Sequence, residues 1–225
     1  KAGTSKHPKY IPVHDIRRQL PNEQVSSILT YHAITGCDTV SQFSGHSKKT
    51  AWRVFQEHHE NLCQLGRGQL TDDISKSAEK FSCQIYRVPK AKTCDEARMK
   101  LFCMGWPQEA LPPTSDAACF HIMRSHYQAS VWIQAHKTSP ILPTTTEMGW
   151  YCKNGQLLPR LLSLPPIPKA CAEILSRGCC KGCLSRACSC RKNSLPCIEA
   201  CKCYTYGNRC QRSTQKGVLH VPACC

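Results

Sequence analysis

Residues 20–62 have the sequence LPNEQVSSILTYHAITGCDTVSQFSGHSKKTAWRVFQEHHENL. Starting at Pro21, which suits the first turn of a helix, apolar residues recur at helical spacing until Gly36. The members of this first run are Val25, Ile28, Leu29 and Ala33. A second run at the same spacing places four residues on one side: Ala51, Val54, Phe55 and Leu62. The stretch therefore predicts a helix, a turn of small residues and a second helix that begins beside Lys48 and Lys49.

Two further helices and a proline-rich segment are expected downstream. Cys94, Ala97, Leu101 and Phe102 have the spacing of a short amphipathic helix. A longer pattern over 116–135, with Ser115 as the expected N-cap, predicts a second helix. Its expected buried stripe consists of Ala117, Phe120, Met123, Tyr127 and Val131. Six prolines between residues 138 and 168 exclude a long regular helix and predict an extended connector.

The C-terminal region holds nine cysteines within residues 179–210, whose sequence is CCKGCLSRACSCRKNSLPCIEACKCYTYGNRC. Two Cys-x-Cys pairs each offer two thiolates from one extended stretch, and four thiolates in tetrahedral geometry suit zinc. Three zinc ions need twelve ligand positions, which nine cysteines supply if three of them bridge two metals each. The alternatives are a disulfide scaffold, which would leave one thiol unpaired, and an iron–sulfur site. The predicted zinc ligands are Cys179, Cys180, Cys183, Cys188, Cys190, Cys197, Cys201, Cys203 and Cys210.

The pattern Cys183-x4-Cys188-x-Cys190-x6-Cys197-x3-Cys201-x-Cys203 resembles the core of the CXC domain, which includes the tesmin-type repeats. This resemblance implies a fold around three zinc ions shared by nine cysteines, and DNA binding as in several members. The chain departs from the family at both ends, where it opens with the adjacent Cys179 and Cys180 and closes at Cys210. It also has Ala187 where the tesmin-type repeats carry a tyrosine that contacts DNA. The ligand roles of the end cysteines and the tesmin mode of base contact therefore stay open.

The charge of the chain favours an anionic partner. The sequence has 30 Lys and Arg against 15 Asp and Glu, a net charge of +15. Nine basic residues between 177 and 216 face a single acid, Glu199. Nine thiolates with three Zn²⁺ would carry a net charge of about −3, so part of the positive charge balances the cluster and the rest is free for phosphates. The alternative is a solvated basic face. The expected nucleic-acid contacts here are Arg186, Arg191, Lys192 and Lys202.

The segments 34–38 (ITGCD) and 45–51 (GHSKKTA) resemble the helix-hairpin-helix region of flap-endonuclease and related PIN-like nucleases. The resemblance implies that Asp38 helps to bind catalytic Mg²⁺ and that the glycine loop presents backbone amides to a DNA phosphate. The residues implied in nucleic-acid binding are Gly45, Ser47, Lys48 and Lys49. Ser47 and Thr39 replace a glycine and a tyrosine of the family pattern. The alternative from the residues alone is an ordinary turn in which Asp38 caps a helix.

The predicted fold class is mainly α, in three parts. Residues 10–135 form an α-helical region with the helix-hairpin-helix-like motif, residues 136–170 the proline-rich connector, and residues 176–212 a small irregular zinc-binding module. Similar stretches occur in mobile-element-derived animal proteins, some of which end in a cysteine cluster. Because the first residue is Lys1, we expect the chain to be the C-terminal part of such a protein.

The predicted function is that of a zinc-binding, nucleic-acid-binding protein, with DNA as the expected partner, derived from a PIN-like nuclease. Before Asp38 the chain offers only Asp15 and Glu23 as acids, too few for two-metal catalysis. One alternative is an active Mg²⁺-dependent nuclease whose catalytic half lies upstream, and another is a structural zinc module that binds protein. The cysteine usage predicts an intracellular reducing compartment, and a nuclear location is expected. No apolar run has membrane-spanning length, so no membrane partner is expected.

Overall fold

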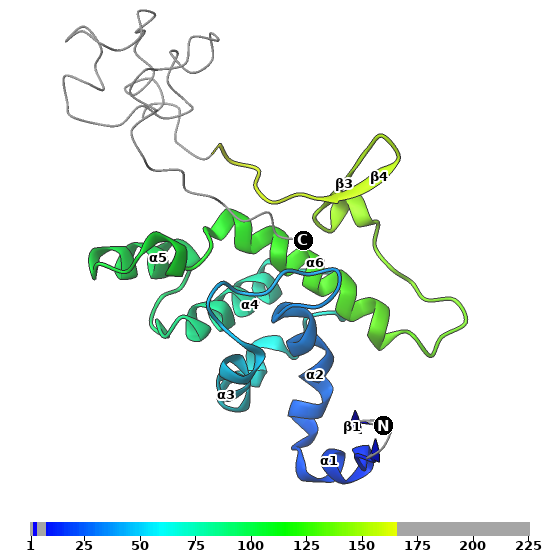
Figure 1. Cartoon of the computed structure of the whole chain (residues 1–225). Coiled ribbons are helices and arrows are strands. Elements are labelled where there is room, and N and C mark those ends of the chain that lie inside the picture. Colours follow the sequence, from blue (N-terminus) through cyan, green and yellow to red (C-terminus); the bar gives the residue numbers. More distant parts are fainter. Residues whose placement is uncertain (1, 4–7, 166–225) are drawn as a thin grey trace, which may run out of the picture. The chain divides into compact units, whose positions relative to one another are not determined.

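The computed structural model describes residues 2–3 and 8–165. The chain divides into two compact units, Lys1–Ser163 and Leu164–Cys225, and the described elements belong to the first. This part is mainly helical, as predicted (Figure 1). Its longer helices are α1 (Val13–Gln19), α2 (Asn22–Ile34), α3 (Lys48–His58), α4 (Asp72–Ile85), α5 (Cys94–Cys103) and α6 (Ser115–Ile133). The short 3₁₀ turns are η1 (His59–Leu62), η2 (Gln108–Ala110) and η3 (Thr145–Glu147).

Two small antiparallel pairs complete the described secondary structure. Strand β1 (Ala2–Gly3) pairs with β2 (Pro8–Lys9), and β3 (Trp150–Lys153) pairs with β4 (Gln156–Pro159). The core lies among the helices: α6 contacts both α2 and α4, and α3 packs against α4 (Figure 1). The fully buried side chains at its centre include Ile34, Phe55 and Phe81. Burial of apolar side chains therefore stabilises this unit.

The predicted pair of helices in residues 20–62 is confirmed. Pro21 precedes the first residue of α2, and α3 with η1 covers the second run. Ala51, Phe55 and Leu62 are buried as expected. The Phe55 ring lies 4.7 Å from that of Tyr31 and 5.2 Å from that of Trp52 between centroids, so it fixes α3 against the end of α2.

The apolar run of α2 does not coincide with its buried face, because Leu29 is 38% exposed while Ser27 and Thr30 are fully buried. Both hydroxyls donate to carbonyls of their own helix, Ser27 to Glu23 at 2.9 Å and Thr30 to Ser27 at 2.6 Å. A small hydroxyl satisfied in this way can be buried at little cost, and it lets a neighbouring helix approach closely.

The expected buried stripe of α6 is also wrong. Its members, Ala117, Phe120, Met123, Tyr127 and Val131, are only half-buried. The buried face lies one position along the helix and contains many polar residues: Ala118, His121, Ile122, Arg124, Ser125, His126, Ala129 and Ser130. The N-cap is Thr114, whose hydroxyl accepts from the Ala117 amide at 3.2 Å, and Ser115 instead begins the helix.

The buried histidines of α6 have complete hydrogen bonding as neutral rings. His121 donates from Nε2 to the Ile34 carbonyl at 2.8 Å, and its Nδ1 lies 3.4 Å from the Ser41 hydroxyl. His126 accepts from the Gly66 amide at 3.0 Å and donates to the Gly68 carbonyl at 3.1 Å. Because these partners come from the tertiary fold, a pattern of apolar residues cannot find this face.

The proline-rich stretch contains a β-hairpin that the sequence analysis did not predict. Strands β3 and β4 are joined by Asn154 and Gly155, both with positive φ (51° and 76°). This dipeptide favours a tight hairpin turn. Trp150 is buried, with its ring centroid 5.3 Å from that of Tyr127, and the Arg160 amide donates to the Gly149 carbonyl at 2.8 Å.

Candidate nucleic-acid interface

The turn that follows α2 is fixed tightly to the core. Gly36 has φ of 106°, and a Cβ at this position would lie 2.8 Å from the Cβ of Gln42, so both the backbone and the space require glycine. Cys37 and Val40 exchange backbone hydrogen bonds of 2.8 and 3.3 Å, which places Asp38 at the tip of the turn. The hydroxyl of the next residue, Thr39, donates to the Gln128 side chain of α6 at 2.6 Å.

Asp38 is exposed and caps none of the described helices, because α2 ends at Thr35 and α3 is capped by Ser47. Its charge acts on the neighbouring His32, whose pKa is lowered by burial and by Lys48, while Asp38 acts in the opposite direction. Within residues 10–165, no three His, Cys, Asp or Glu side chains are close enough together to hold a metal ion. A metal role for Asp38 therefore needs ligands from outside the described residues.

The loop before α3 presents Gly45 at the surface. Phe43 is buried, with its ring centroid 6.1 Å from that of Tyr86 and 4.9 Å from that of His121, and the His46 ring centroid also lies 4.5 Å from that of Tyr86. Between these two contacts, Gly45 has φ of 73°, and no atom lies within 4 Å of where its Cβ would be. A ligand backbone can therefore approach the loop closely at this position.

Ser47 begins α3 as its N-cap, with the hydroxyl accepting from the Thr50 amide at 3.3 Å. The amides of Ser47, Lys48 and Lys49 have no acceptor among the described residues. Free amides in the first turn of a helix carry a partial positive charge and can bind an anion. Gly45, Ser47, Lys48 and Lys49 are thus brought together at the exposed start of α3, whereas Asp38 lies in the turn after α2.

The two predicted lysines have different roles. The Lys48 ammonium donates to the His32 carbonyl and to the Thr35 hydroxyl, both at 2.9 Å, and its own carbonyl accepts from the Tyr31 hydroxyl at 2.6 Å. Burial lowers the pKa of Lys48. Lys48 therefore joins the end of α2 to the start of α3, whereas exposed Lys49 makes no hydrogen bond or ion pair with any described residue.

Two further cations belong to this surface and were missed in the sequence analysis. Arg53 is exposed and lies four residues after Lys49, on the same face of α3. Arg87 lies near His46, since its charge and the burial of the imidazole together lower the pKa of His46. The spacing of Arg53 was visible in the sequence, but Arg87 is brought here only by the packing of α3 on α4.

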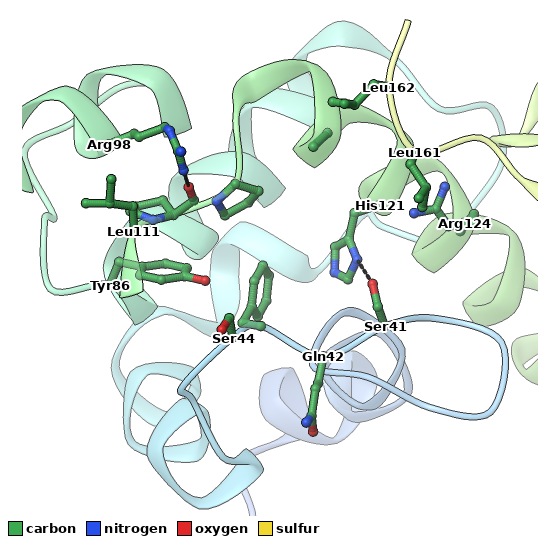
Figure 2. Close-up of a pocket in the computed structure, with 14 residues that line it drawn as sticks. Ser41, Gln42, Ser44, Tyr86, Arg98, Leu111, His121, Arg124, Leu161 and Leu162 are labelled. Atoms are coloured by element: carbon green, nitrogen blue, oxygen red, sulfur yellow. Dashed lines mark hydrogen bonds between the residues drawn. The ribbon is translucent and has the colours of Figure 1, made fainter. Parts of the chain in front are cut away.

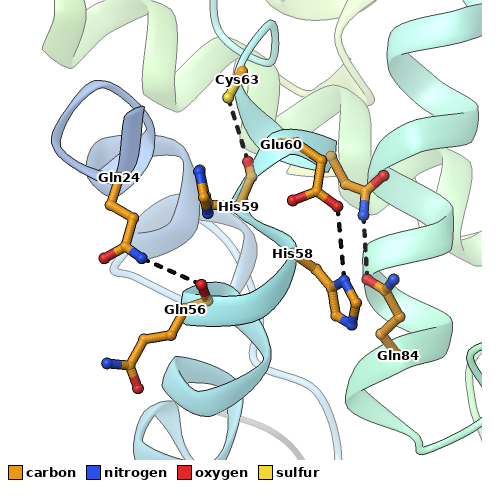
Figure 3. A network of polar contacts seen from close by, with 8 residues as sticks. Gln24, Gln56, His58, His59, Glu60, Cys63 and Gln84 are labelled. Atoms are coloured by element: carbon orange, nitrogen blue, oxygen red, sulfur yellow. Dashed lines mark hydrogen bonds and ion pairs between the residues drawn. The ribbon is translucent and has the colours of Figure 1, made fainter. Parts of the chain in front are cut away.

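The junction at η1 combines residue types that often bind metal (Figure 3). The His58 ring lies 3.6 Å from the Glu60 carboxylate, and the Cys63 thiol donates to the His59 carbonyl at 3.5 Å. Asn61 donates to Gln84 at 3.3 Å, which joins the junction to α4. The side chains of His58, Glu60 and Cys63 are used in these contacts, whereas His59 Nδ1 is buried without a partner among the described residues. No group of three His, Cys, Asp or Glu side chains that could hold a metal ion forms in the described part of the chain.

The predicted zinc ligands and the basic residues between them all lie outside the described residues: Cys179 to Cys210, Arg186, Arg191, Lys192 and Lys202. The seven cysteines that the structure does describe are free thiols.

None of the described helices combines the length and the apolar character needed to cross a membrane. Comparisons with protein-family models, with curated proteins and with solved structures found no match.

Proposed function

We propose that this chain is a zinc-dependent nucleic-acid-binding protein, with DNA as its partner, and that it derives from a PIN-like nuclease. It contacts the phosphate backbone at two places, the start of α3 and the basic residues of the cysteine-rich segment. A reducing, nuclear compartment is part of this proposal. The observation that carries it is the exposed start of α3, where three free amides lie beside Lys49.

The chemistry of this surface fits a phosphate better than a neutral ligand. Backbone amides at a helix N-terminus donate to phosphate oxygens, and Gly45 leaves room for the sugar–phosphate chain to approach. Lys49 and Arg53 add positive charge along the same face of α3. These contacts position a protein on DNA without reading its sequence.

The cysteine-rich segment supplies the zinc-dependent part of the proposal. Three Zn²⁺ bound by the nine cysteines would hold Arg186, Arg191, Lys192 and Lys202 on one small module. Because metal binding to such a site is coupled to folding, DNA affinity would depend on zinc even though α3 does not.

The test compares two charge-matched double variants in the full chain. Lys49→Ala/Arg53→Ala removes two cations from the proposed interface, and Lys76→Ala/Lys80→Ala removes two exposed cations with the same spacing from α4. Binding to a labelled 20-base-pair duplex is measured by fluorescence anisotropy across a series of salt concentrations. We expect the α3 pair to weaken binding about tenfold and to lower the salt slope by about 2.

The α4 pair should change affinity less than twofold. Equal losses in the two variants would remove α3 from the interface and leave only general charge attraction. No salt-dependent binding by the unmodified chain would contradict the proposal and favour a structural zinc module that binds protein.

A further inference from the structure

A cleft of about 390 Å³ is lined on one side by the loop 41–44 (Figure 2). Its walls come from this loop, from the segment 111–113 before α6, from α6 itself and from residues 161–162. The apolar lining consists mainly of Phe43, Leu111, Pro112, Pro113, Leu161 and Leu162. The volume is in the range of sites that hold a small organic molecule.

Arg124 carries a buried positive charge beside this cleft. The residue is 4% exposed, and one guanidinium nitrogen, Nη1, donates to the carbonyls of Gly149 at 3.2 Å and Arg160 at 2.6 Å. Its other N–H groups have no acceptor among the described residues. Among the described residues, His59 Nδ1 is the only side-chain nitrogen or oxygen that is both fully buried and without a partner. The unpartnered nitrogens of Arg124 are therefore not fully buried. Arg124 is also one of the residues that line the cleft.

No acid neutralises this charge within the described part of the chain. Neither Arg124 nor Arg98, the second arginine of the cleft, forms an ion pair there, and no Asp or Glu lines the cleft. Arg98 donates from Nη1 to the Pro112 carbonyl at 2.6 Å. His121 also lines the cleft, but its ring is neutral at pH 7, so the positive charge comes from the arginines. A buried cation without a counter-ion is costly, and an anion that enters the cleft would lower that cost.

We propose that this cleft binds a small ligand that combines an oxyanion with an apolar body. The oxyanion, a carboxylate or a phosphate, accepts from the free N–H groups of Arg124, for which the planar guanidinium is well suited. The apolar body packs against Phe43, Leu111 and the leucines at 161–162. This site adjoins the loop that presents Gly45, but the proposal does not depend on nucleic-acid binding.

The test measures binding of four probes to the full chain by isothermal titration calorimetry. The probes are 3-phenylpropionate, phenyl phosphate, the neutral 3-phenylpropionamide and inorganic phosphate. We expect an anion with an aromatic body to bind at least about tenfold more tightly than the amide, as for a hydrogen-bonded charge. Whichever of 3-phenylpropionate and phenyl phosphate binds more tightly identifies the preferred oxyanion. Inorganic phosphate, which has no apolar body, should bind more weakly than phenyl phosphate.

Variants locate the binding without removing Arg124, whose hydrogen bonds also support the fold. Leu162 is 46% exposed and lines the cleft, so Leu162→Glu places a competing negative charge at its edge. It should weaken binding of the anion about tenfold, whereas Leu162→Gln should retain most of it. Leu157→Glu, on β4 and outside the cleft, is the matched control and should bind as the unmodified chain does. Equal binding of the anion and the amide, or equal losses in Leu162→Glu and Leu157→Glu, would overturn the proposal.

Discussion

The helical unit and the cysteine-rich segment differ in almost every property that stabilises a fold. Residues 10–163 bury an apolar core around Ile34, Phe55 and Phe81. Residues 166–225 hold twelve of the 19 cysteines and ten of the 30 basic residues, but only two of the 15 acids. The first region is held together by burial, whereas the second has few apolar residues and, in our proposal, needs zinc to fold.

This difference also separates the two proposed contacts with DNA. The start of α3 is held by contacts within the helical unit, such as the Lys48 ammonium on the His32 carbonyl. The arginines and lysines of the cysteine-rich segment would depend on the metal for their positions. The cysteine-rich segment should therefore respond to removal of metal, and the helical unit to substitutions in its core.

Chelation should produce the largest effect, and only in one region. Structural zinc sites contribute about 10–16 kcal/mol in small zinc-binding peptides, so its removal should unfold residues 179–210 completely. Hydrogen exchange followed by mass spectrometry should show loss of protection there and unchanged protection in α2, α4 and α6. DNA affinity should fall about tenfold or more as the metal-dependent phosphate contacts are lost. Loss of protection in both regions together would mean that they fold as one unit.

A core substitution should have the opposite selectivity. Phe55 is fully buried in contact with Tyr31 and Trp52, and Phe55→Ala should lower the free energy of unfolding of the helical unit by about 3–5 kcal/mol. Phe102, which is 64% exposed on α5, is the matched control. Phe102→Ala should change the free energy of unfolding by no more than about 0.5 kcal/mol. Urea unfolding followed by circular dichroism measures both, and the zinc content should be the same in the two variants. A loss of zinc in Phe55→Ala would show that the cysteine-rich segment depends on the helical core for its fold.

Acid should destabilise the helical unit through its buried histidines. Burial lowers the pKa of His121 to about 4, with Arg124 adding to the shift, and burial also lowers the pKa of His126. Because the unfolded chain takes up the proton first, the stabilisation is complete above pH 6.5 and is lost as the pH falls towards 4. For His121 alone the loss at pH 5 is about 2 kcal/mol.

His121→Asn tests this prediction, because it removes the titrating group and leaves a side chain that can still form hydrogen bonds. The dependence of the urea midpoint on pH between 7 and 5 should become clearly shallower in this variant, even if its stability at pH 7 is lower. An unchanged dependence would place the acid sensitivity elsewhere. Zinc content is followed in the same samples, because thiolate ligands also release metal in acid.

Four of the six longer helices, α2, α3, α5 and α6, were predicted from the sequence, because apolar spacing and terminal residues such as Pro21 and Gly36 act locally, whereas α1 and α4 were not predicted. The buried faces of α2 and α6 could not be predicted, because Ser27 and His121 are buried through hydrogen bonds that only the fold supplies. The hairpin β3–β4 could have been predicted from Asn154 and Gly155, whose signal is local.

The candidate sites divide in the same way. Grouping of Gly45, Ser47 and Lys49 at one helix end was predictable, because these residues are close in the sequence. The structural role of Lys48 was not, because it depends on how the end of α2 meets α3. The cleft at Arg124 left no signal in the sequence, since its walls come from segments up to about 120 residues apart.

The zinc content of the full chain is the most direct test of the proposed zinc module. Protein purified under reducing conditions and without added metal is analysed by native mass spectrometry and elemental analysis, with cysteine oxidation measured in parallel. We expect three zinc ions per chain and reduced cysteines throughout residues 179–210. Protein without zinc, or with these cysteines paired in disulfides, would contradict it.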